Sequence, residues 1–204
     1  KYRKGNKKYQ KFRIMTKNLA ILASGSGTNA ESIAKYFVNN DAVSVKIIIS
    51  NNADAYVHER AKQLGIPSVT ISRKDVMNTD ALLRVLESYK IDFVVLAGYL
   101  VRIPDNVTEK YNHKMVNIHP SLLPKFGGKG MYGNRVHEAV IEAKEKESGI
   151  TIHYTNDKYD EGEVIFQAKC EVKPDDTPDS LAHRIHALEY EYYPRVIEET
   201  LMKE

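Results

Sequence analysis

The stretch Leu19-Ala20-Ile21-Leu22-Ala23-Ser24-Gly25-Ser26-Gly27-Thr28-Asn29 joins a short apolar run to a glycine-rich turn. The run predicts a strand that is buried on both faces, because such strands read as continuously apolar rather than alternating. Ile33, Ala34 and Phe37 follow the turn at helical spacing, which predicts a helix. The stretch therefore indicates strand, glycine loop and helix, the repeating unit of an α/β fold.

The same alternation continues through the first half of the chain. We expect further strands at residues 45–49, 68–71 and 93–97, and helices at about 55–64 and around 82–86. Strands of this kind form a parallel sheet with helices on both sides.

The second half of the chain does not continue this alternation of strands and helices. We expect a strand at 114–118, a helix around 136–145, and alternating strands at 150–154 and 164–168 that pair antiparallel across a short connection. Thr177 and Pro178 open a final helix with a capping hydroxyl and a first-turn proline, and Pro194 should kink or interrupt it. The prediction is a Rossmann-like, mostly parallel α/β sheet with helices on both faces and an antiparallel C-terminal strand pair.

Composition limits the class of protein. The 204 residues are 42% hydrophobic, enough for one sizeable core. The single cysteine, Cys170, excludes an intramolecular disulfide and a cysteine cluster for zinc, and we expect no metal. No apolar run reaches the roughly 20 residues of a membrane-spanning helix. We therefore expect a soluble, cytoplasmic protein with no membrane partner.

The positive charge is concentrated at the N-terminus. Residues 1–14 hold seven basic residues and no acid, and because the whole chain carries +3, the remainder carries −4. With Tyr2, Tyr9 and Phe12 interleaved, this segment could bind RNA or an anionic surface. We favour a flexible extension, or a misassigned start upstream of Met15, and expect no nucleic-acid partner, because no basic stripe continues into the body.

The glycine turn is suited to binding an anion. Gly25 and Gly27 let the backbone approach an oxyanion closely, Thr28 and Asn29 add donors, and the following helix presents unpaired N–H groups at its positive end. The spacing is neither the dinucleotide fingerprint, since Ala30 stands three positions after Gly27, nor a P-loop. A tight turn without a ligand is the alternative.

A second motif, Asn117-Ile118-His119-Pro120-Ser121-Leu122-Leu123-Pro124, is suited to chemistry at a carbonyl. In an extended strand, side chains at i and i+2 share a face, so Asn117 and His119 can converge on one reacting atom while Ile118 faces the core. The alternative is that both side chains only hydrogen-bond a turn.

Together these motifs resemble the phosphoribosylglycinamide formyltransferase family. The resemblance runs from about Asn18 to the C-terminus, which implies a single formyltransferase domain at 18–204 after a basic extension at 1–17. It rests, in order along the chain, on Gly25–Asn29, Val95–Tyr99, Asn117–Pro124, Asp160–Gly162 and Glu189–Pro194. It implies purine biosynthesis from small-molecule substrates, by transfer of a formyl group from the co-substrate 10-formyltetrahydrofolate to the amine of glycinamide ribonucleotide, in a monomer or homodimer.

The resemblance also assigns roles to residues. The catalytic group it implies is His119, Asn117 and Asp160; on the residues alone, Asp157 competes with Asp160 as the carboxylate beside the imidazole. The ribonucleotide contacts that it implies are Gly25, Ser26, Gly27, Thr28, Asn29, Glu31, His186 and Glu189. The folate contacts that it implies are Leu100, Val101, Arg102, Ile103, Asn117, Asn156, Asp157, Tyr159 and Asp160.

Two departures from the family pattern concern the folate's glutamate tail. The position of an arginine common in the family is Val101 in this chain, and that of a second arginine falls near Thr79. The sequence therefore does not identify which residues would hold the glutamate tail. The loop Gly127–Gly133 is either a mobile cover over the site or a plain connection. The alternative functions are a formyltransferase of the same family acting on another amine, and a non-catalytic nucleotide- or RNA-binding module.

Overall fold

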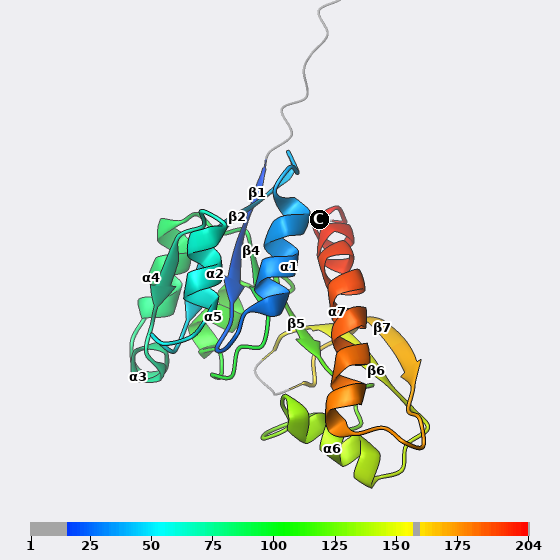
Figure 1. Cartoon of the computed structure of the whole chain (residues 1–204). Coiled ribbons are helices and arrows are strands. Elements are labelled where there is room, and N and C mark those ends of the chain that lie inside the picture. The colour runs from blue at the N-terminus through cyan, green and yellow to red at the C-terminus, as the bar shows by residue number, and fades with distance from the viewer. Residues whose placement is uncertain (1–15, 157–159, 204) are drawn as a thin grey trace, which may run out of the picture.

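The computed structural model describes residues 16–156 and 160–203, and within them the chain forms seven strands and seven helices (Figure 1). The strands are β1 Lys17–Leu22, β2 Val43–Ser50, β3 Ser68–Thr70, β4 Phe93–Leu96, β5 Met115–His119, β6 Glu147–Tyr154 and β7 Val164–Glu171. The helices are α1 Thr28–Phe37, α2 Val57–Gln63, α3 Arg73–Asn78, α4 Ala81–Ser88, α5 Asp105–Lys110, α6 Asn134–Glu142 and α7 Pro178–Leu201. The basic segment 1–14, Asp157 and Tyr159 lie outside the described residues.

All seven strands join one sheet in the order β3-β2-β1-β4-β5-β6-β7. The five strands β3, β2, β1, β4 and β5 run parallel, whereas β6 pairs antiparallel with both β5 and β7. The predicted fold class is confirmed. The antiparallel part is larger than a terminal pair, because β6 also reverses direction against β5.

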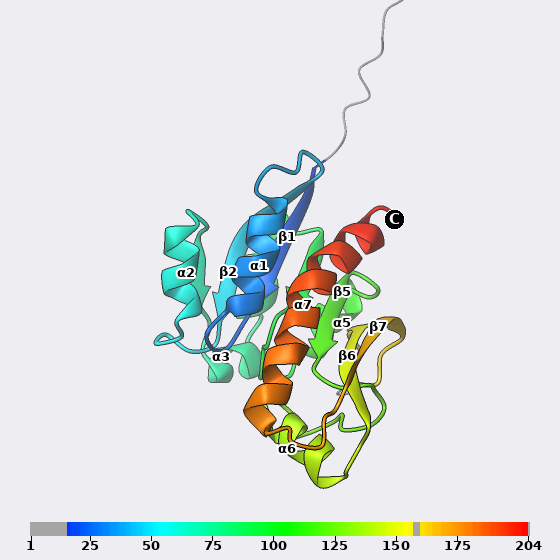
Figure 2. The same cartoon turned by 45° about the vertical axis from the view of Figure 1, so that its right-hand side comes forward.

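Helices cover both faces of the sheet, and successive residues of β1 show why. Leu19 and Ile21 point into the core under α1, α2 and α7, whereas Ala20 and Leu22 point into the core under α3, α4 and α5. All four side chains are fully buried, so β1 needs apolar residues at every position from Leu19 to Leu22. Turning the molecule shows α1 and α7 side by side on one face (Figure 2).

Helix α7 runs through Pro194 without a break, so the expected interruption is wrong. A proline removes one backbone hydrogen bond, but this turn is held against the sheet. The Tyr193 ring is fully buried and its hydroxyl donates to the carbonyl oxygens of Leu96 at 2.8 Å and Val116 at 3.3 Å. The predicted start is confirmed, since the Thr177 side chain accepts from the Ser180 N–H in a capping box with Pro178 in the first turn.

In the ranges that the structure describes, no helix is long and apolar enough to cross a membrane.

Candidate active site

The site lies where the direction of strand addition reverses, between β1 and β4, and at the neighbouring end of β5. In open α/β sheets, ligands bind at the carboxyl ends of strands at such a point. Ser24, after β1, ties the loops together: its N–H donates to the Gly98 carbonyl at 3.0 Å, and its hydroxyl donates to the Asn51 side chain at 2.5 Å and accepts from the Leu100 N–H at 2.8 Å. The loops that follow β1, β2 and β4 therefore form one connected rim.

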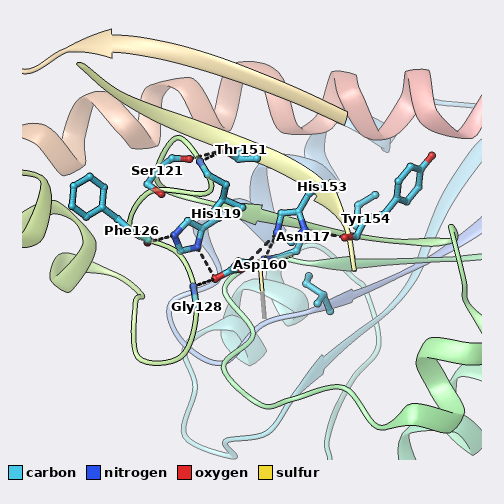
Figure 3. A network of polar contacts seen from close by, with 12 residues as sticks. Asn117, His119, Ser121, Phe126, Gly128, Thr151, His153, Tyr154 and Asp160 are labelled. Atoms are coloured by element: carbon cyan, nitrogen blue, oxygen red, sulfur yellow. Dashed lines mark hydrogen bonds and ion pairs between the residues drawn. The ribbon is translucent and has the colours of Figure 1, made fainter. Parts of the chain in front are cut away.

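Asn117 and His119 stand on one face at the end of β5, as predicted (Figure 3). The intervening Ile118 packs into the core. The His119 ring is buried, at 4% exposure. Its Nε2 lies 2.7 Å from the Phe126 carbonyl oxygen, which can only accept, so the proton resides on Nε2 and Nδ1 is left facing Asp160.

Asp160 connects three segments of the chain (Figure 3). Its Oδ2 accepts from the Gly128 N–H at 2.9 Å and lies 3.5 Å from His119 Nδ1. Its Oδ1 lies 3.5 Å from Asn117 Nδ2 and 3.7 Å from His153 Nε2. The structure thus brings Asn117, His119 and Asp160 together.

His153 is a member of this cluster that the sequence interpretation missed. Strand β6 places it directly opposite Asn117, with His153 Nε2 at 3.2 Å from Asn117 Nδ2. Its Nδ1 lies 2.9 Å from the Tyr154 carbonyl oxygen, so Nδ1 carries the proton and Nε2 accepts from the amide. A signal existed: in the alternating run 150–154, His153 shares a face with Thr151 rather than with the isoleucines.

Thr151 holds the loop that follows β5. Its hydroxyl donates to the Ser121 carbonyl at 2.7 Å and accepts from the Leu123 N–H at 3.0 Å and the Gln167 side chain at 2.8 Å. Because these bonds fix the chain directly after His119, they limit where the imidazole can move.

The environment sets the charge of the cluster. Burial lowers the pKa of His119, although the Asp160 charge and the Phe126 carbonyl act in the opposite direction. Burial would raise the pKa of Asp160, but the neighbouring His153 and His119 rings and the N–H of Gly128 together leave it below its ordinary value. Near neutral pH, a neutral imidazole therefore lies beside an ionised carboxylate.

The glycine turn opens α1. Gly27 has a φ of 73°, in the left-handed region that favours glycine, and a Cβ built on it would lie 2.3 Å from Val57 Cγ2. Ser26 is exposed and Thr28 is half-buried beside it. The turn therefore requires glycine for two reasons, conformation and close approach.

Asn29 and Glu189 meet beside this turn. Asn29 Nδ2 donates to Glu189 Oε2 at 2.9 Å, while Asn29 Oδ1 is buried and has no hydrogen-bond partner within the described part of the chain. Glu189 is only 6% exposed, so its side chain does not lie on a solvated face of α7. Burial raises its pKa to about 7, with the Asn29 bond acting in the opposite direction. Buried groups that lack full pairing are suited to receive a polar ligand.

Two other predicted contacts of the ribonucleotide have partners in the protein. The Glu31 carboxylate pairs with Lys35 Nζ at 2.6 Å and with Arg60. The His186 ring stacks on Tyr190 with centroids 6.1 Å apart, and burial, with His183 second, lowers its pKa.

The predicted folate segment divides into buried and exposed side chains. Val101 and Ile103 lie in the core on the α4 side, so only their main chain can face a ligand. Leu100 is 51% exposed, and Arg102 pairs with Asp105 at 2.7 Å. Asn156 is exposed, just after β6.

His137 is a second residue that the sequence interpretation missed. It lies on α6 and is almost fully buried, and its Nδ1 lacks a hydrogen-bond partner among the described residues. Burial, followed by the proximity of His186 and His119, lowers its pKa to about 4, so the ring is neutral. Its apolar neighbours Val136 and Val140 on α6 made it look like an ordinary core position.

Within residues 16–156 and 160–203, no group of three or more His, Cys, Asp or Glu side chains is arranged to hold a metal ion.

Comparison with known proteins agrees with this geometry. The family model described as formyl transferase matches residues 17–197. The chain is 38% identical over 190 residues to a phosphoribosylglycinamide formyltransferase, chloroplastic, of Arabidopsis thaliana, covering 89% of this chain and 64% of that relative. It is 38% identical over 186 residues to the Haemophilus influenzae phosphoribosylglycinamide formyltransferase, covering 89% of this chain and 85% of that relative. The solved phosphoribosylglycinamide formyltransferase of Bacillus halodurans superposes with a TM-score of 0.82 at 36% identity, covering 91% of this chain and 95% of that one.

Proposed function

The chain belongs to the formyl transferase family, and from this we propose that it transfers a formyl group from 10-formyltetrahydrofolate to the amine of glycinamide ribonucleotide, in purine biosynthesis. Relatives at 35–38% identity carry the name of that enzyme. The observation that carries the proposal is the convergence of Asn117, His119 and Asp160 at the end of β5.

The chemistry follows from the groups present. The substrate amine attacks the formyl carbon, a new C–N bond forms, and the formyl oxygen gains negative charge before the bond to the folate nitrogen breaks. The Asn117 amide would donate to that oxygen in place of its 3.5 Å contact with Asp160 Oδ1, and one such donor commonly contributes a factor of about 10² to 10³ in rate. The proton that leaves the amine is finally delivered to the folate nitrogen.

His119 is the group that we assign to this proton. Its Nδ1 lone pair faces Asp160, so uptake of a proton there produces an imidazolium 3.5 Å from a carboxylate. The charge pair stabilises the imidazolium, and the bond from Nε2 to Phe126 holds the ring in place meanwhile. Asp160 is thus the partner that makes His119 a competent base.

The ribonucleotide is assigned to the rim around α1. Its phosphate would lie on the N–H groups of Gly25–Asn29 at the positive end of α1. Its ribose hydroxyls would reach the Glu189 carboxylate and the unpartnered Asn29 Oδ1. His186 lies one helical turn before Glu189 on α7, near enough to border the same site.

The folate is assigned to the other side of the cluster. Main-chain groups of Leu100–Ile103 and the segment around Asn156 would contact the pterin, and Asp157 and Tyr159 belong to this assignment although they lie outside the described residues. Because the Val101 side chain is buried, it cannot replace an arginine at the glutamate tail. Arg102 is the nearest cation on this segment, and it already pairs with Asp105.

Residues 18–204 form the catalytic domain in this proposal, since strands β1 to β7 join one sheet and α7 packs against it. A cytoplasmic location is part of the same proposal and rests on the free thiol of Cys170. The absence of a metal from the mechanism is likewise proposed, because no step needs a Lewis acid.

The proposal is tested by supplying both substrates and measuring release of tetrahydrofolate. We expect turnover by the wild type and a loss of about 10² to 10⁴ in kcat for His119→Ala. His113→Ala is the matched control, because that side chain is 63% exposed and contacts Glu163 and the Tyr154 ring rather than Asn117, His119 or Asp160, and it should retain full activity. Circular dichroism would establish that both variants fold. A fully active His119→Ala would refute the role of His119.

The acceptor is tested separately. Calorimetry with glycinamide ribonucleotide should show binding, whereas a formyltransferase specific for another amine predicts none.

A further inference from the structure

Helix α2 contacts three consecutive residues of the glycine turn, a feature that the proposed mechanism does not use. The Val57 N–H donates to the Gly25 carbonyl at 3.2 Å, and Arg60 Nε donates to the Ser26 carbonyl at 2.8 Å. The Val57 side chain closes against Gly27, where it leaves no room for a Cβ. The turn is therefore fixed from the α2 side.

These contacts determine where the N–H groups of the turn point. In a trans peptide, the C=O of one residue and the N–H of the next point in opposite directions. Because the Gly25 and Ser26 carbonyls face α2, the N–H groups of Ser26 and Gly27 face away from α2. Two successive N–H groups aimed to one side form a concave anion site, and this one lies at the start of the ten-residue helix α1.

Arg60 is itself held rigidly. Its Nη1 pairs with Glu31, its guanidinium carbon lies 5.1 Å from the centre of the Tyr56 ring, and its side chain is only 22% exposed. The planar guanidinium can bond a carbonyl and a carboxylate at once, which the single ammonium of a lysine cannot do with the same fixed geometry. Glu31 thus connects α1 to Arg60, with Lys35 as its second partner.

We propose that Arg60 is a positioning residue for phosphate recognition: by holding the Ser26 carbonyl toward α2, it orients the Gly27 N–H toward the substrate phosphate, and Glu31 acts through Arg60 rather than by touching substrate. This inference rests on the proposed function, since it assigns a role at the ribonucleotide phosphate. In this proposal, α2 contributes to substrate binding by orienting a main-chain N–H group, a task that no side chain at the reacting centre performs.

Steady-state kinetics on the full chain test the proposal. Arg60→Gln should raise the KM for glycinamide ribonucleotide about tenfold, the size of one lost charge-assisted hydrogen bond. The inhibition constant of inorganic phosphate should rise in parallel, while kcat and the KM for 10-formyltetrahydrofolate stay within about twofold of wild type. The KM for glycinamide ribonucleotide should stay raised in Arg60→Lys as well, because lysine keeps the positive charge but lacks the planar guanidinium that bonds the Ser26 carbonyl and Glu31 together.

Lys35→Gln is the matched control. It removes one positive charge from the same Glu31 network without contacting the glycine turn, and it should leave all constants unchanged. If Lys35→Gln raised the same KM, or if Arg60→Lys restored it fully, net charge rather than orientation would be responsible and the proposal would be overturned.

The remaining outcomes separate the two proposals. A wild-type chain with no formyl transfer to glycinamide ribonucleotide defeats the proposed function. An active wild type with an unchanged KM in Arg60→Gln defeats only the role of Arg60. A fall in kcat together with a lower unfolding temperature would show that Arg60 supports the fold in general, which also contradicts a positioning role.

Discussion

The charge of Asp160 controls the proton on His119, because the two side chains lie 3.5 Å apart in a buried cluster. The carboxylate raises the pKa of His119, while burial, the larger effect, lowers it. We therefore expect the acid limb of kcat/KM in the wild type to lie below pH 6.5, where His119 becomes protonated.

Asp160→Asn should shift this limb to lower pH. Removal of the negative charge takes away the influence that raises the His119 pKa, so the imidazole stays neutral at more acidic pH. The plateau of kcat should fall by about 10² because the imidazolium formed during proton transfer loses its partner. The pH profile of kcat/KM measures the shift of the limb, and the pH profile of kcat measures the fall of the plateau. A limb that moved to higher pH would contradict the assigned pairing.

Glu189 makes folding stability depend on pH. Its pKa rises from an ordinary 4.5 to about 7 in the folded state through burial, so between these values the folded chain holds a proton that the unfolded chain has released. Stability is therefore lost as pH rises from 4.5 to 7, by about 3 kcal/mol.

Glu189→Gln should remove that loss. We expect the difference in unfolding free energy, variant minus wild type, to be about 3 kcal/mol more positive at pH 8 than at pH 4.5. Urea denaturation at both pH values measures this difference. A constant difference across this range would show that Glu189 is not perturbed. The same variant should weaken ribonucleotide binding at pH 8, which isothermal calorimetry would detect.

Among the helices, α7 carries two residues of the proposed acceptor site. His186 and Glu189 lie in its first half, and the buried Tyr193 fastens the next turn to β4 and β5. Its start depends on Thr177, whose hydroxyl accepts from the Ser180 N–H at 3.2 Å.

Thr177→Ala should lower the free energy of unfolding by about 1 kcal/mol through loss of this cap. Thr177→Asp should retain most of the stability, since a carboxylate also caps and favours the positive end of the helix. Thermal unfolding of the two variants compares them directly. Equal destabilisation by both would indicate that packing, and not the cap, fixes the start of α7.

The strands and long helices were predictable because each follows its own periodicity. The glycine turn, the strand before Asn117 and the Thr177 cap lie where the sequence places them. Helices α3 and α5 were missed because six residues are too few to show a helical period. The interruption predicted at Pro194 does not occur, because the rule for proline considers only the local chain and not the tertiary contacts of Tyr193.

At the scale of the whole molecule, the sheet begins at Lys17, and the body that follows carries the site. Deleting residues 1–14 should leave kcat and both KM values unchanged within about twofold, because every residue assigned to the proposed chemistry lies at Gly25 or beyond. Assays of the truncated chain would check this, with fluorescence titration of single-stranded RNA as the second readout. Loss of formyl transfer on truncation would contradict a domain at 18–204.

The α/β class, the glycine turn and the shared face of Asn117 and His119 could be predicted from the sequence, because strand and helix periods are local and the motif occupies consecutive residues. The family that these segments indicated is confirmed. The packing of the folded chain brings His153 into the cluster, buries Glu189 against Asn29 and directs Arg60 to the Ser26 carbonyl, and none of this could be predicted from the sequence. Each of these contacts joins residues 34 to 160 positions apart in the chain, and such distances are set by how the sheet is ordered and how helices pack on it, which no local pattern records.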